Sequence, residues 1–333
     1  MTVLVTGGAG YIGSHMVWEL LDAGEQVVVL DRLSTGFDWA VAPEARLVVG
    51  DIADSGLVAK LVRENGIDAV IHFAGSIVVP ESVADPLAYY ENNTCKTRAL
   101  IEAAVSAGVA HFIFSSTAAV YGGAGMEPVG EDAPLAPESP YGRSKLMSEW
   151  MLRDAAAAHG LRYTALRYFN VAGADPKGRA GQSTPGATHL IKVACETALG
   201  KRASMQVYGN DYPTPDGTCI RDYIHVSDLA AAHRLALRRL RDGGDSLVAN
   251  CGYGHGYSVL EVVDSVRRVF GGDFEVLTGP RRAGDAAAVV ANADRARREF
   301  GWRPRHDDLD AIVADALSWE RSLATRNTLR GQM

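Results

Sequence analysis

Residues 3–13 have the sequence VLVTGGAGYIG, in which a short apolar run leads into a glycine-rich turn. The apolar run predicts a buried strand, and the segment that follows the turn, as far as Ala23, has the apolar period of a helix. Gly7, Gly10 and Gly13 predict a tight turn whose backbone can approach a pyrophosphate at the helix N-terminus. Because their spacing departs from the usual GxGxxG pattern, these glycines alone are weak evidence for a dinucleotide site.

The same alternation continues through the first half of the chain. Short β-rich apolar segments predict further strands, and segments of helical period separate them. This order indicates right-handed βαβ crossovers and a parallel sheet that is buried on both faces. We therefore predict an α/β fold with a doubly wound, Rossmann-type domain. The predicted strands cover residues 26–31, 46–49, 69–73, 111–115 and 163–168, and the predicted helices cover 57–65, 93–107 and 144–158.

The composition of the chain changes after Asn170, where the connecting segments become rich in Gly and Pro. We expect residues 1–170 to form the cofactor domain and residues 171–333 to form mainly a smaller α/β substrate-binding domain. The strand-like segment 247–251, within a return segment near 223–256, would rejoin the first sheet and interleave the two domains. Further helices are predicted from an N-cap at Ser258 to Phe270, over 293–300 and over 309–323.

Composition argues against several classes of protein. The net charge is −7, 47% of the residues are hydrophobic, and no apolar run approaches the ~18 residues that cross a bilayer. No signal peptide is indicated, so we expect a cytoplasmic protein without a membrane partner. An acidic balance without basic clusters argues against nucleic acid as a partner. The four cysteines, at 95, 195, 219 and 251, predict free and mostly buried thiols, and no metal is expected because the nine histidines lack metal-ligand spacing.

Residues after the second, third and fourth predicted strands are suited to a dinucleotide. Asp31 closes the second strand, where a carboxylate would accept hydrogen bonds from an adenosine ribose and repel a 2′-phosphate, so NAD is favoured over NADP. Arg32 beside it could blur this preference, and a solvated loop cation is the alternative. The next two turns, for which a simple βα connection is the alternative, offer Asp51 and Ile52 for adenine contact and Phe73, Ala74 and Gly75 for close approach of the backbone.

Tyr141 and Lys145 are four residues apart, which places them on one face of a helix. A phenol with a pKa near ~10 is a poor base at neutral pH, and a fixed cation beside it would favour the phenolate. Such a pair can move a proton while a nicotinamide moves a hydride. A solvated helix face is the alternative, but the hydroxyls of Ser115, Ser116 and Thr117 at a strand end can bridge Tyr141 to a substrate oxygen.

Several motifs resemble those of the extended short-chain dehydrogenase/reductase superfamily, and within it those of the UDP-glucose (UDP-galactose) 4-epimerases. The resemblance covers essentially the whole chain, and its most specific block is YGNDYPTPDGTCIRDYIHVSDLAAAH over residues 208–233. The other motifs are GGAGYIGSH (7–15), FAGS (73–76), PESVADPLAYYENN (80–93), FSSTAAVYG (114–122), SPYGRSK (139–145), LRYFNVAGAD (166–175) and RRAGD (281–285).

This resemblance implies inversion of carbon 4 of a UDP-hexose with tightly bound NAD. NAD would take a hydride from that carbon while Tyr141 takes the hydroxyl proton, Thr117 acts as a relay, and Lys145 lowers the Tyr141 pKa and holds the nicotinamide ribose. The 4-keto sugar would then turn over while Arg221 and Arg282 anchor the diphosphate. The resemblance further implies cofactor contacts at Tyr11, Ile12, Asn92, Ser115 and Phe169, and substrate contacts at Asn170, Leu190, Tyr208 and Asp285. It also implies a homodimer built on helices 93–107 and 144–158.

Three positions depart from the pattern of these epimerases. Ile77 stands where many members carry a Lys, and His189 stands where the best-known members carry an Asn. Val289 stands where some members have a Tyr that restricts the sugar pocket, so a UDP-N-acetylhexosamine, a UDP-pentose or a UDP-uronate is an alternative substrate. For Arg221, the alternative is a structural ion pair with Asp222 or Asp228.

Two other functions stay open at this point. Nucleotide-sugar dehydratases and decarboxylases add an acid after the strand-end Thr or Ser, whereas Ala118 and Ala119 follow Thr117 here. A binding protein that kept the fold without the chemistry is the second alternative, because a fold does not fix a function. His225 is interpreted as a packed residue instead of a ligand.

Overall fold

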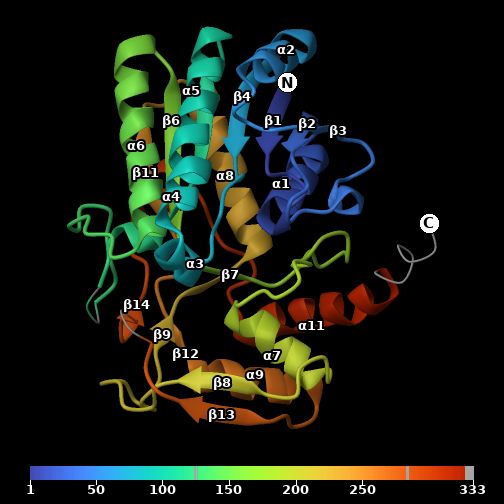
Figure 1. Ribbon diagram of the computed structural model, residues 1–333, viewed down its shortest axis with the longest axis vertical. Helices are drawn as coiled ribbons and strands as arrows, with labels where there is room; N and C mark the ends of the chain where they lie inside the picture. Colours follow the sequence, from blue (N-terminus) through green and yellow to red (C-terminus); the bar gives the residue numbers. More distant parts are fainter. Residues whose placement is uncertain (124, 126, 283–284, 327–333) are drawn as a thin grey trace.

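The computed structural model describes residues 1–123, 125, 127–282 and 285–326 of the chain. A large parallel sheet with helices on both faces lies at one end, and a smaller region of short strands and helices lies at the other (Figure 1). Within the described ranges, none of the helices combines the length and the apolarity needed to cross a membrane.

Seven parallel strands form the large sheet, in the order β11-β6-β5-β4-β1-β2-β3. From β1 the chain first adds strands on one side, to β3, and then on the other side, from β4 to β11. This change of side at β1 is the doubly wound topology that the sequence predicts. The strands are β1 (Thr2–Thr6), β2 (Gln26–Asp31), β3 (Arg46–Val49), β4 (Ile67–His72), β5 (His111–Thr117), β6 (Arg162–Tyr168) and β11 (Leu247–Cys251).

Helices cover both faces of this sheet (Figure 1). One face carries apolar side chains of α2, α5 and α6, including Val58, Leu100 and Leu152, and the other carries those of α1 and α8, including Met16 and Leu237. Burial on both faces explains why the strands are continuously apolar instead of alternating. The five helices are α1 (Tyr11–Asp22), α2 (Ser55–Asn65), α5 (Lys96–Ser106), α6 (Pro140–His159) and α8 (Val226–Arg241).

The smaller region is built from short paired strands and three longer helices. Its strand pairs are β7 (Asn170–Ala172) with β10 (Tyr223–His225), β8 (Met205–Tyr208) with β13 (Val276–Gly279), and β9 (Ile220–Arg221) with both β12 (Tyr257–Ser258) and β14 (Ala288–Val289). Its helices are α7 (Leu190–Ala198), α9 (Val259–Phe270) and α11 (Leu309–Arg326). The remaining elements are α3 (Val79–Ala84), α4 (Pro86–Tyr89), α10 (Asp294–Phe300), two short 3₁₀ turns η1 (Asp38–Ala40) and η3 (Ala118–Val120), and a π-helical segment η2 (Tyr90–Cys95).

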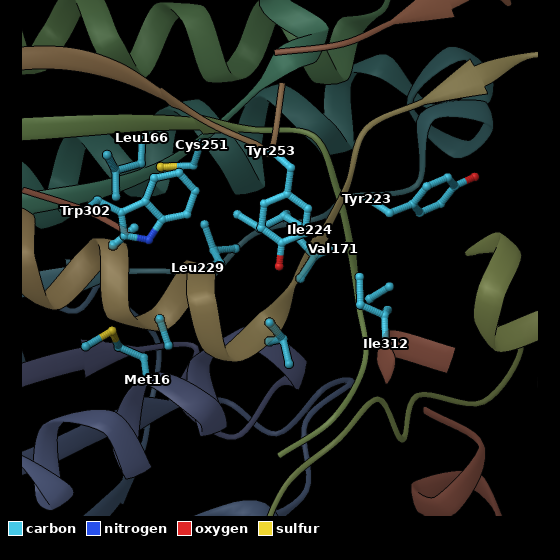
Figure 2. Close-up of a cluster of buried hydrophobic side chains, with 14 of the residues drawn as sticks. Met16, Leu166, Val171, Tyr223, Ile224, Leu229, Cys251, Tyr253, Trp302 and Ile312 are labelled. Atoms are coloured by element: carbon cyan, nitrogen blue, oxygen red, sulfur yellow. The ribbon is translucent and has the colours of Figure 1, made fainter. Parts of the chain in front are cut away.

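The two regions share one hydrophobic core. The same cluster contains Val5 and Leu166 from the large sheet and Trp302 and Ile312 from the C-terminal part of the chain. Figure 2 shows the side chains that both regions contribute, with Tyr223 on the opposite side of the view from Trp302. Continuous burial of this kind resists separation of the regions, since each buried apolar side chain contributes about 1.5–3 kcal/mol.

Several sequence predictions can be compared directly with these elements. The strand 247–251 pairs in parallel with β6, so its predicted return to the first sheet is confirmed, whereas the domain boundaries themselves stay a prediction. Ser258 forms the predicted N-cap, with a capping box to Glu261. All four cysteines are free, and three of them are buried, as predicted.

Two predicted helix starts were wrong. Helix α6 begins at Pro140, four residues before the predicted start, because the Ser139 hydroxyl caps the Gly142 N–H and proline suits the first helical turn. Helix α5 begins at Lys96 instead of Asn93, since residues 90–95 wind as a π-helical segment. Within that segment, the Asn93 carbonyl accepts a hydrogen bond from Ser148 of α6.

Candidate active site

The predicted cofactor residues lie at one edge of the large sheet. Gly7 follows β1, Asp31 ends β2, Asp51 follows β3, Phe73 follows β4 and Thr117 ends β5. Because parallel strands place their carboxyl ends at the same edge, these residues gather beside the point where the strand order reverses, which is where doubly wound sheets bind ligands.

The glycine turn needs glycine for two distinct reasons. Gly7 has φ +73°, and a Cβ on it would lie only 2.6 Å from the backbone nitrogen of Ala74. A Cβ on Gly13 would lie 2.1 Å from the carbonyl oxygen of Gly7. The turn after β1 therefore packs backbone to backbone against the turn after β4, which leaves no room for side chains.

Helix α1 begins beneath this turn with free backbone donors. Gly10 is its N-cap, and within this fully described turn neither a side-chain cap nor an acidic residue occupies the helix start. The first N–H groups, at Tyr11 and Ile12, therefore face an anion-binding position. The Tyr11 hydroxyl donates to the carbonyl oxygen of Gly173 at 2.7 Å, which ties the turn to the loop after β7.

Asp31 holds the glycine turn and its own loop together. One carboxylate oxygen accepts from the N–H of Ala9 at 3.0 Å, and the other accepts from the N–H of Leu33 at 2.8 Å. Arg32 is 45% exposed and lies 3.9 Å from Asp51, which matches the solvated loop cation given above as the alternative. These contacts leave the Asp31 carboxylate at the strand end, where it disfavours a second negative charge.

Asp51 and Ile52 lie beside the same edge. Asp51 pairs with Lys96 of α5 and accepts from the N–H of Ala53, and Ile52 is buried. Hydrogen bonding to Lys96 lowers the pKa of Asp51 despite the opposing effect of burial. Ile52 and Asp51 thus place an apolar side chain and a fixed carboxylate after β3, as an adenine contact would require.

The turn after β4 is held by two asparagines of the π-helical segment. The Asn92 amide donates to the Ser76 hydroxyl at 2.9 Å. Asn93 accepts from the Ser76 N–H at 2.8 Å and donates to the Ser76 carbonyl at 2.9 Å. A further bond from Asn93 to the Ser144 hydroxyl joins this turn to α6. Asn92, the predicted cofactor residue, thus lies at the cofactor turn, and Asn93 carries most of the bonding.

Thr117, Tyr141 and Lys145 come together at the ends of β5 and α6. All three residues are buried, and the Thr117 hydroxyl lies near enough to the Tyr141 phenol to lower its pKa. The Lys145 ammonium donates to the carbonyl oxygen of Ser115 at 3.0 Å and lies 5.1 Å from the centre of the Phe114 ring. The Ser115 hydroxyl bonds to the phenol of Tyr168. The predicted catalytic residues therefore form one cluster.

The pKa of Tyr141 differs from the sequence prediction. Burial raises this pKa, and the hydrogen bond from Thr117 only partly opposes the effect, so the net direction is upward instead of downward. Burial also lowers the pKa of Lys145 to about 8, because its ammonium has a carbonyl and an aromatic ring around it instead of a carboxylate. The phenol is thus protonated at rest, and its proton transfer depends on charges that the bound ligands add.

The predicted diphosphate residues lie in the smaller region. Arg221 on β9 forms an ion pair with Asp285, and the Arg282 guanidinium lies 3.8 Å from the centre of the Tyr208 ring. Four predicted substrate residues are therefore in mutual contact as two pairs. Residues 283–284, which complete the predicted RRAGD motif, lie outside the described residues.

The alternative partners that the sequence offered for Arg221 were wrong. The Asp222 carboxylate accepts from the backbone N–H groups of Tyr253, Gly254 and Ala291. The Asp228 carboxylate accepts from backbone N–H groups at 305 and 306 and from the Tyr253 phenol. Both carboxylates are buried and occupied, so Arg221 pairs across the strands with the more exposed Asp285.

The remaining predicted residues lie on β7, α7 and β14 and on the link between β6 and β7. Asn170 on β7 and Leu190 at the start of α7 line one pocket with His189 and Tyr223, and Phe169 lies between β6 and β7. His189 is hydrogen-bonded to Gln182 at 2.7 Å, and burial lowers its pKa. Val289 on β14 is the register partner of Arg221, so it lies beside the predicted anchor.

Comparison with known proteins agrees with this geometry. The model of the family described as "NAD dependent epimerase/dehydratase family" matches residues 3–252. A UDP-glucose 4-epimerase of Azospirillum brasilense is 59% identical over 96% of this chain and 92% of its own, and one of Lacticaseibacillus casei is 47% identical over 97% of both chains. This chain belongs to the NAD dependent epimerase/dehydratase family. A solved UDP-glucose 4-epimerase of Brucella ovis in complex with NAD is 46% identical, superposes with a TM-score of 0.93, and covers 95% of this chain and 97% of its own.

The cofactor of this family fits the residues described above. The uncapped start of α1 at Gly10 provides free backbone donors for a pyrophosphate. Asp31 lies at the end of β2, where it suits a ribose with free hydroxyls. The Lys145 ammonium lies beside Gly75 in the turn after β4. In a member of this family, these residues would hold the dinucleotide from its adenosine end to its nicotinamide end.

Sequence reasoning missed two residues of the site. Asn92 was predicted instead of Asn93, although both belong to the quoted motif over 80–93. The two are distinguished by the bonds of Asn93 to the Ser76 backbone and to the Ser144 hydroxyl. Tyr223 lines the pocket with Asn170 and Leu190, and burial raises its pKa. Its position inside the specific block 208–233 was the available signal, but the sequence does not show which side chains of that block face the pocket.

His225 belongs to a cluster of the epimerase fold that lies apart from the catalytic residues. His225, His306 and Asp315 are the one group of potential metal ligands found among the described residues. The His225 Nδ1 accepts from the Ser227 N–H, which leaves its Nε2–H to donate to Asp315 at 3.2 Å. The His225 and His306 rings stack with their centroids 4.4 Å apart and an interplanar angle of 24°. The His225 side chain is fully buried, and its role as a packed residue stays a prediction.

Proposed function

We propose that this family member inverts carbon 4 of a UDP-hexose and so interconverts UDP-galactose and UDP-glucose. The observation that carries the proposal is the buried Thr117–Tyr141–Lys145 cluster at the sheet edge, with two arginines on the opposite, smaller region. The names of the relatives at 47–59% identity over nearly the whole chain support the same reaction.

Each catalytic side chain has a role that follows from its position. Bound NAD would supply the hydride acceptor and donor for carbon 4. Once the positive charges of Lys145 and of the bound cofactor favour its phenolate, Tyr141 can accept the proton of the carbon 4 hydroxyl and give it back in the second half of the reaction. Thr117, which is bonded to this phenol, orients it and hydrogen-bonds the sugar oxygen. Lys145 adds a positive charge to the same cluster and would contact the nicotinamide ribose.

The two arginines hold the nucleotide while the sugar changes face. Arg221 and Arg282 can each donate several charge-assisted hydrogen bonds to diphosphate oxygens. Arg221 already has a carboxylate partner in Asp285, so binding exchanges or shares an existing ion pair. With the diphosphate fixed, a 4-keto sugar can rotate about its link to UDP and present its other face to Tyr141.

The alternatives are less well supported. The residues after Thr117 are Ala118 and Ala119, so the acid that elimination or decarboxylation requires is missing at that place in the sequence. The names of the relatives favour a UDP-hexose over the N-acetylhexosamine, pentose and uronate substrates considered for Val289. The intact cluster of Thr117, Tyr141 and Lys145 argues against a protein that only binds nucleotide sugars.

We also propose a cytoplasmic homodimer that packs through α5 and α6. The support is Trp150, a large apolar side chain of α6 that is 46% exposed. Light scattering coupled to size exclusion would give twice the chain mass, and Trp150→Glu would give the single mass without loss of bound NAD. A wild-type protein that elutes as a monomer at all concentrations would contradict this part of the proposal.

A direct assay tests the reaction. The purified protein is denatured and the released cofactor identified, while the native protein receives UDP-galactose without added NAD. We expect released NAD and steady formation of UDP-glucose. UDP-N-acetylglucosamine and UDP-xylose are assayed in parallel as the alternative substrates. Conversion of neither UDP-galactose nor UDP-glucose by protein that holds NAD would contradict the proposal.

A further inference from the structure

We propose that the buried ion pair between Glu149 and Arg167 sets the position of the catalytic helix α6 along strand β5. The inference rests on the proposed function, since it concerns the residues that place Tyr141 and Lys145. Glu149 and Arg167 are positioning residues: they act through α6 and β5 and do not touch the reacting atoms. Arg167 lies within the motif LRYFNVAGAD (166–175), but the sequence assigned no role to it or to Glu149.

Glu149 continues the catalytic face of α6. Tyr141, Lys145 and Glu149 are spaced four residues apart, so they lie one above the other on the same side of the helix. Each one faces one of the last three residues of β5: Tyr141 interacts with the Thr117 hydroxyl, the Lys145 ammonium donates to the Ser115 carbonyl, and the Glu149 carboxylate accepts from the Ser116 hydroxyl. The helix is therefore joined to the end of this strand at three points.

Arg167 fixes the Glu149 end of this arrangement. It lies on β6, directly across from Ser116 in the parallel register. Its Nε donates to one Glu149 oxygen at 2.9 Å and its Nη2 donates to the other at 2.6 Å, which is a bidentate pair. Its Nη1 donates to the Tyr121 phenol at 3.0 Å, and that phenol donates to Asn250 on β11 at 2.7 Å.

Burial makes this arrangement specific to one position of the helix. The Arg167 and Glu149 side chains are 4% and 5% exposed, so a displaced helix would leave both charges without water and without each other. Buried ion pairs contribute little net stability compared with apolar side chains, but a broken pair is costly. The fixed fork of the guanidinium tolerates only a narrow range of carboxylate positions. The pair therefore selects a single register of α6 on β5, and with it the position of the Tyr141 oxygen.

The large sheet offers a matched control pair at its opposite edge. Arg241 of α8 holds Asp68 of β4 with two bonds, at 2.8 and 2.9 Å, and it also pairs with Glu25. Asp68 lies at the amino end of its strand, away from the edge that carries the catalytic cluster. This pair has the same bidentate chemistry on the same sheet, but its side chains are 11% and 27% exposed and its bonds join α8 to β4 and Glu25 instead of α6.

The test compares kcat, KM and thermal stability of the NAD-loaded variants Glu149→Gln, Arg167→Met and the double variant Glu149→Gln/Arg167→Met. We expect kcat per bound NAD to fall about 100-fold in all three, the loss typical of a misplacement of about 1 Å, while the KM for UDP-galactose stays within about twofold. The double variant should recover the Tm that Arg167→Met loses, since no unpaired buried charge remains, but it should not recover kcat. The controls Asp68→Asn and Arg241→Met should lower the Tm with kcat unchanged.

Three outcomes overturn the inference. Full kcat in Glu149→Gln would show that the pair does not position the helix. Recovery of kcat together with Tm in the double variant would show that the pair serves the fold alone. Equal loss of kcat in the Asp68 and Arg241 variants would show that any ion pair on this sheet has the same effect. A wild-type protein that holds NAD but does not interconvert the two UDP-hexoses would instead contradict the proposed function.

Discussion

The two ends of the proposed active site hold their charged groups in different ways. At the catalytic end, Tyr141 and Lys145 are buried, and their partners are a hydroxyl and a carbonyl of the adjoining strand. At the anchoring end, Arg221 pairs with Asp285, whose side chain is 28% exposed, and Arg282 lies over the Tyr208 ring at the surface. The catalytic end is already built within the fold, whereas the anchoring end must exchange partners when a diphosphate arrives.

This difference separates chemistry from binding. A buried cluster with fixed partners controls proton transfer through small changes in position and pKa. Partly exposed arginines contribute attraction and hold the nucleotide, but salt and neighbouring carboxylates compete for them. Changes at the catalytic end should therefore alter kcat, and changes at the anchoring end should alter affinity.

The largest expected effect is at Tyr141. Tyr141→Phe removes the proton acceptor and keeps the ring, so kcat should fall by about 1,000-fold or more while the affinity for UDP stays within about twofold. Tyr163→Phe, at a buried phenol elsewhere on the sheet, is the control and should keep full activity. Progress curves with UDP-galactose and calorimetry with UDP make the comparison. A Tyr141→Phe variant with unchanged turnover would remove the catalytic assignment.

The buried charge of Lys145 should lower the free energy of unfolding. Its pKa is lowered from 10.5 to about 8 by burial, so the folded protein loses this proton at a lower pH than the unfolded chain does. The stability of the wild type should therefore rise as pH increases from about 8 to 10.5, and the full penalty applies below pH 8. Lys145→Met should be inactive, yet more stable at pH 7 by roughly 2–3 kcal/mol in urea unfolding.

The same pH series supplies the check on Lys145. The advantage of Lys145→Met should shrink as the pH approaches 10.5, because the wild-type lysine is then neutral in both states. Both proteins are compared at equal NAD content. A variant that is less stable than the wild type at pH 7, or a difference in stability that does not change with pH, would contradict the claim that the Lys145 ammonium is buried without a carboxylate partner.

At the anchoring end, the expected effect is on binding. Arg221→Gln removes charge-assisted hydrogen bonds to the diphosphate, so the Kd for UDP should rise roughly 10- to 100-fold while kcat at saturation changes little. Arg281→Gln is a close control, since Arg281 pairs with Asp211 and lies over Tyr212 instead of contacting the Arg221 pair. Loss of kcat without loss of affinity in Arg221→Gln would place this arginine in the chemistry.

The smallest expected effect is that of salt. Raising the NaCl concentration shortens the screening length from about 10 Å near 0.1 M to about 3 Å at 1 M, so partly exposed charges interact less. The Kd for UDP should therefore rise several-fold over this range, while kcat at saturating substrate stays nearly constant because the catalytic cluster is buried. Equal sensitivity of kcat and Kd to salt would erase the distinction between the two ends.

The sequence predicted the catalytic end better than the anchoring end. Residues near each other in a repeated βα pattern follow from local rules, so the strand ends that carry Gly7, Asp31 and Thr117 were placed before the structure was known. The spacing of Tyr141 and Lys145 likewise gave their common face, although the early helix start at Pro140 and the raised pKa of Tyr141 were not predicted.

Long-range pairs were beyond the reach of the sequence. Arg221 had acidic neighbours one and seven residues away, but the structure pairs it with Asp285 because the nearer carboxylates accept backbone N–H groups. Glu149 and Arg167 are likewise brought together only by the packing of α6 on β5 and β6. Such choices are decided by competition for hydrogen bonds in the folded state, which no local pattern records.

The central claim is that the carbon 4 hydrogen leaves and returns within this one site while Tyr141 handles the hydroxyl proton. It is tested most directly by giving the protein, as purified and without added nucleotide, UDP-galactose that carries deuterium at carbon 4. The account predicts UDP-glucose with the deuterium still at carbon 4, and no such conversion by Tyr141→Phe. Loss of the deuterium to solvent, or product formed only with stoichiometric consumption of added NAD, would contradict it.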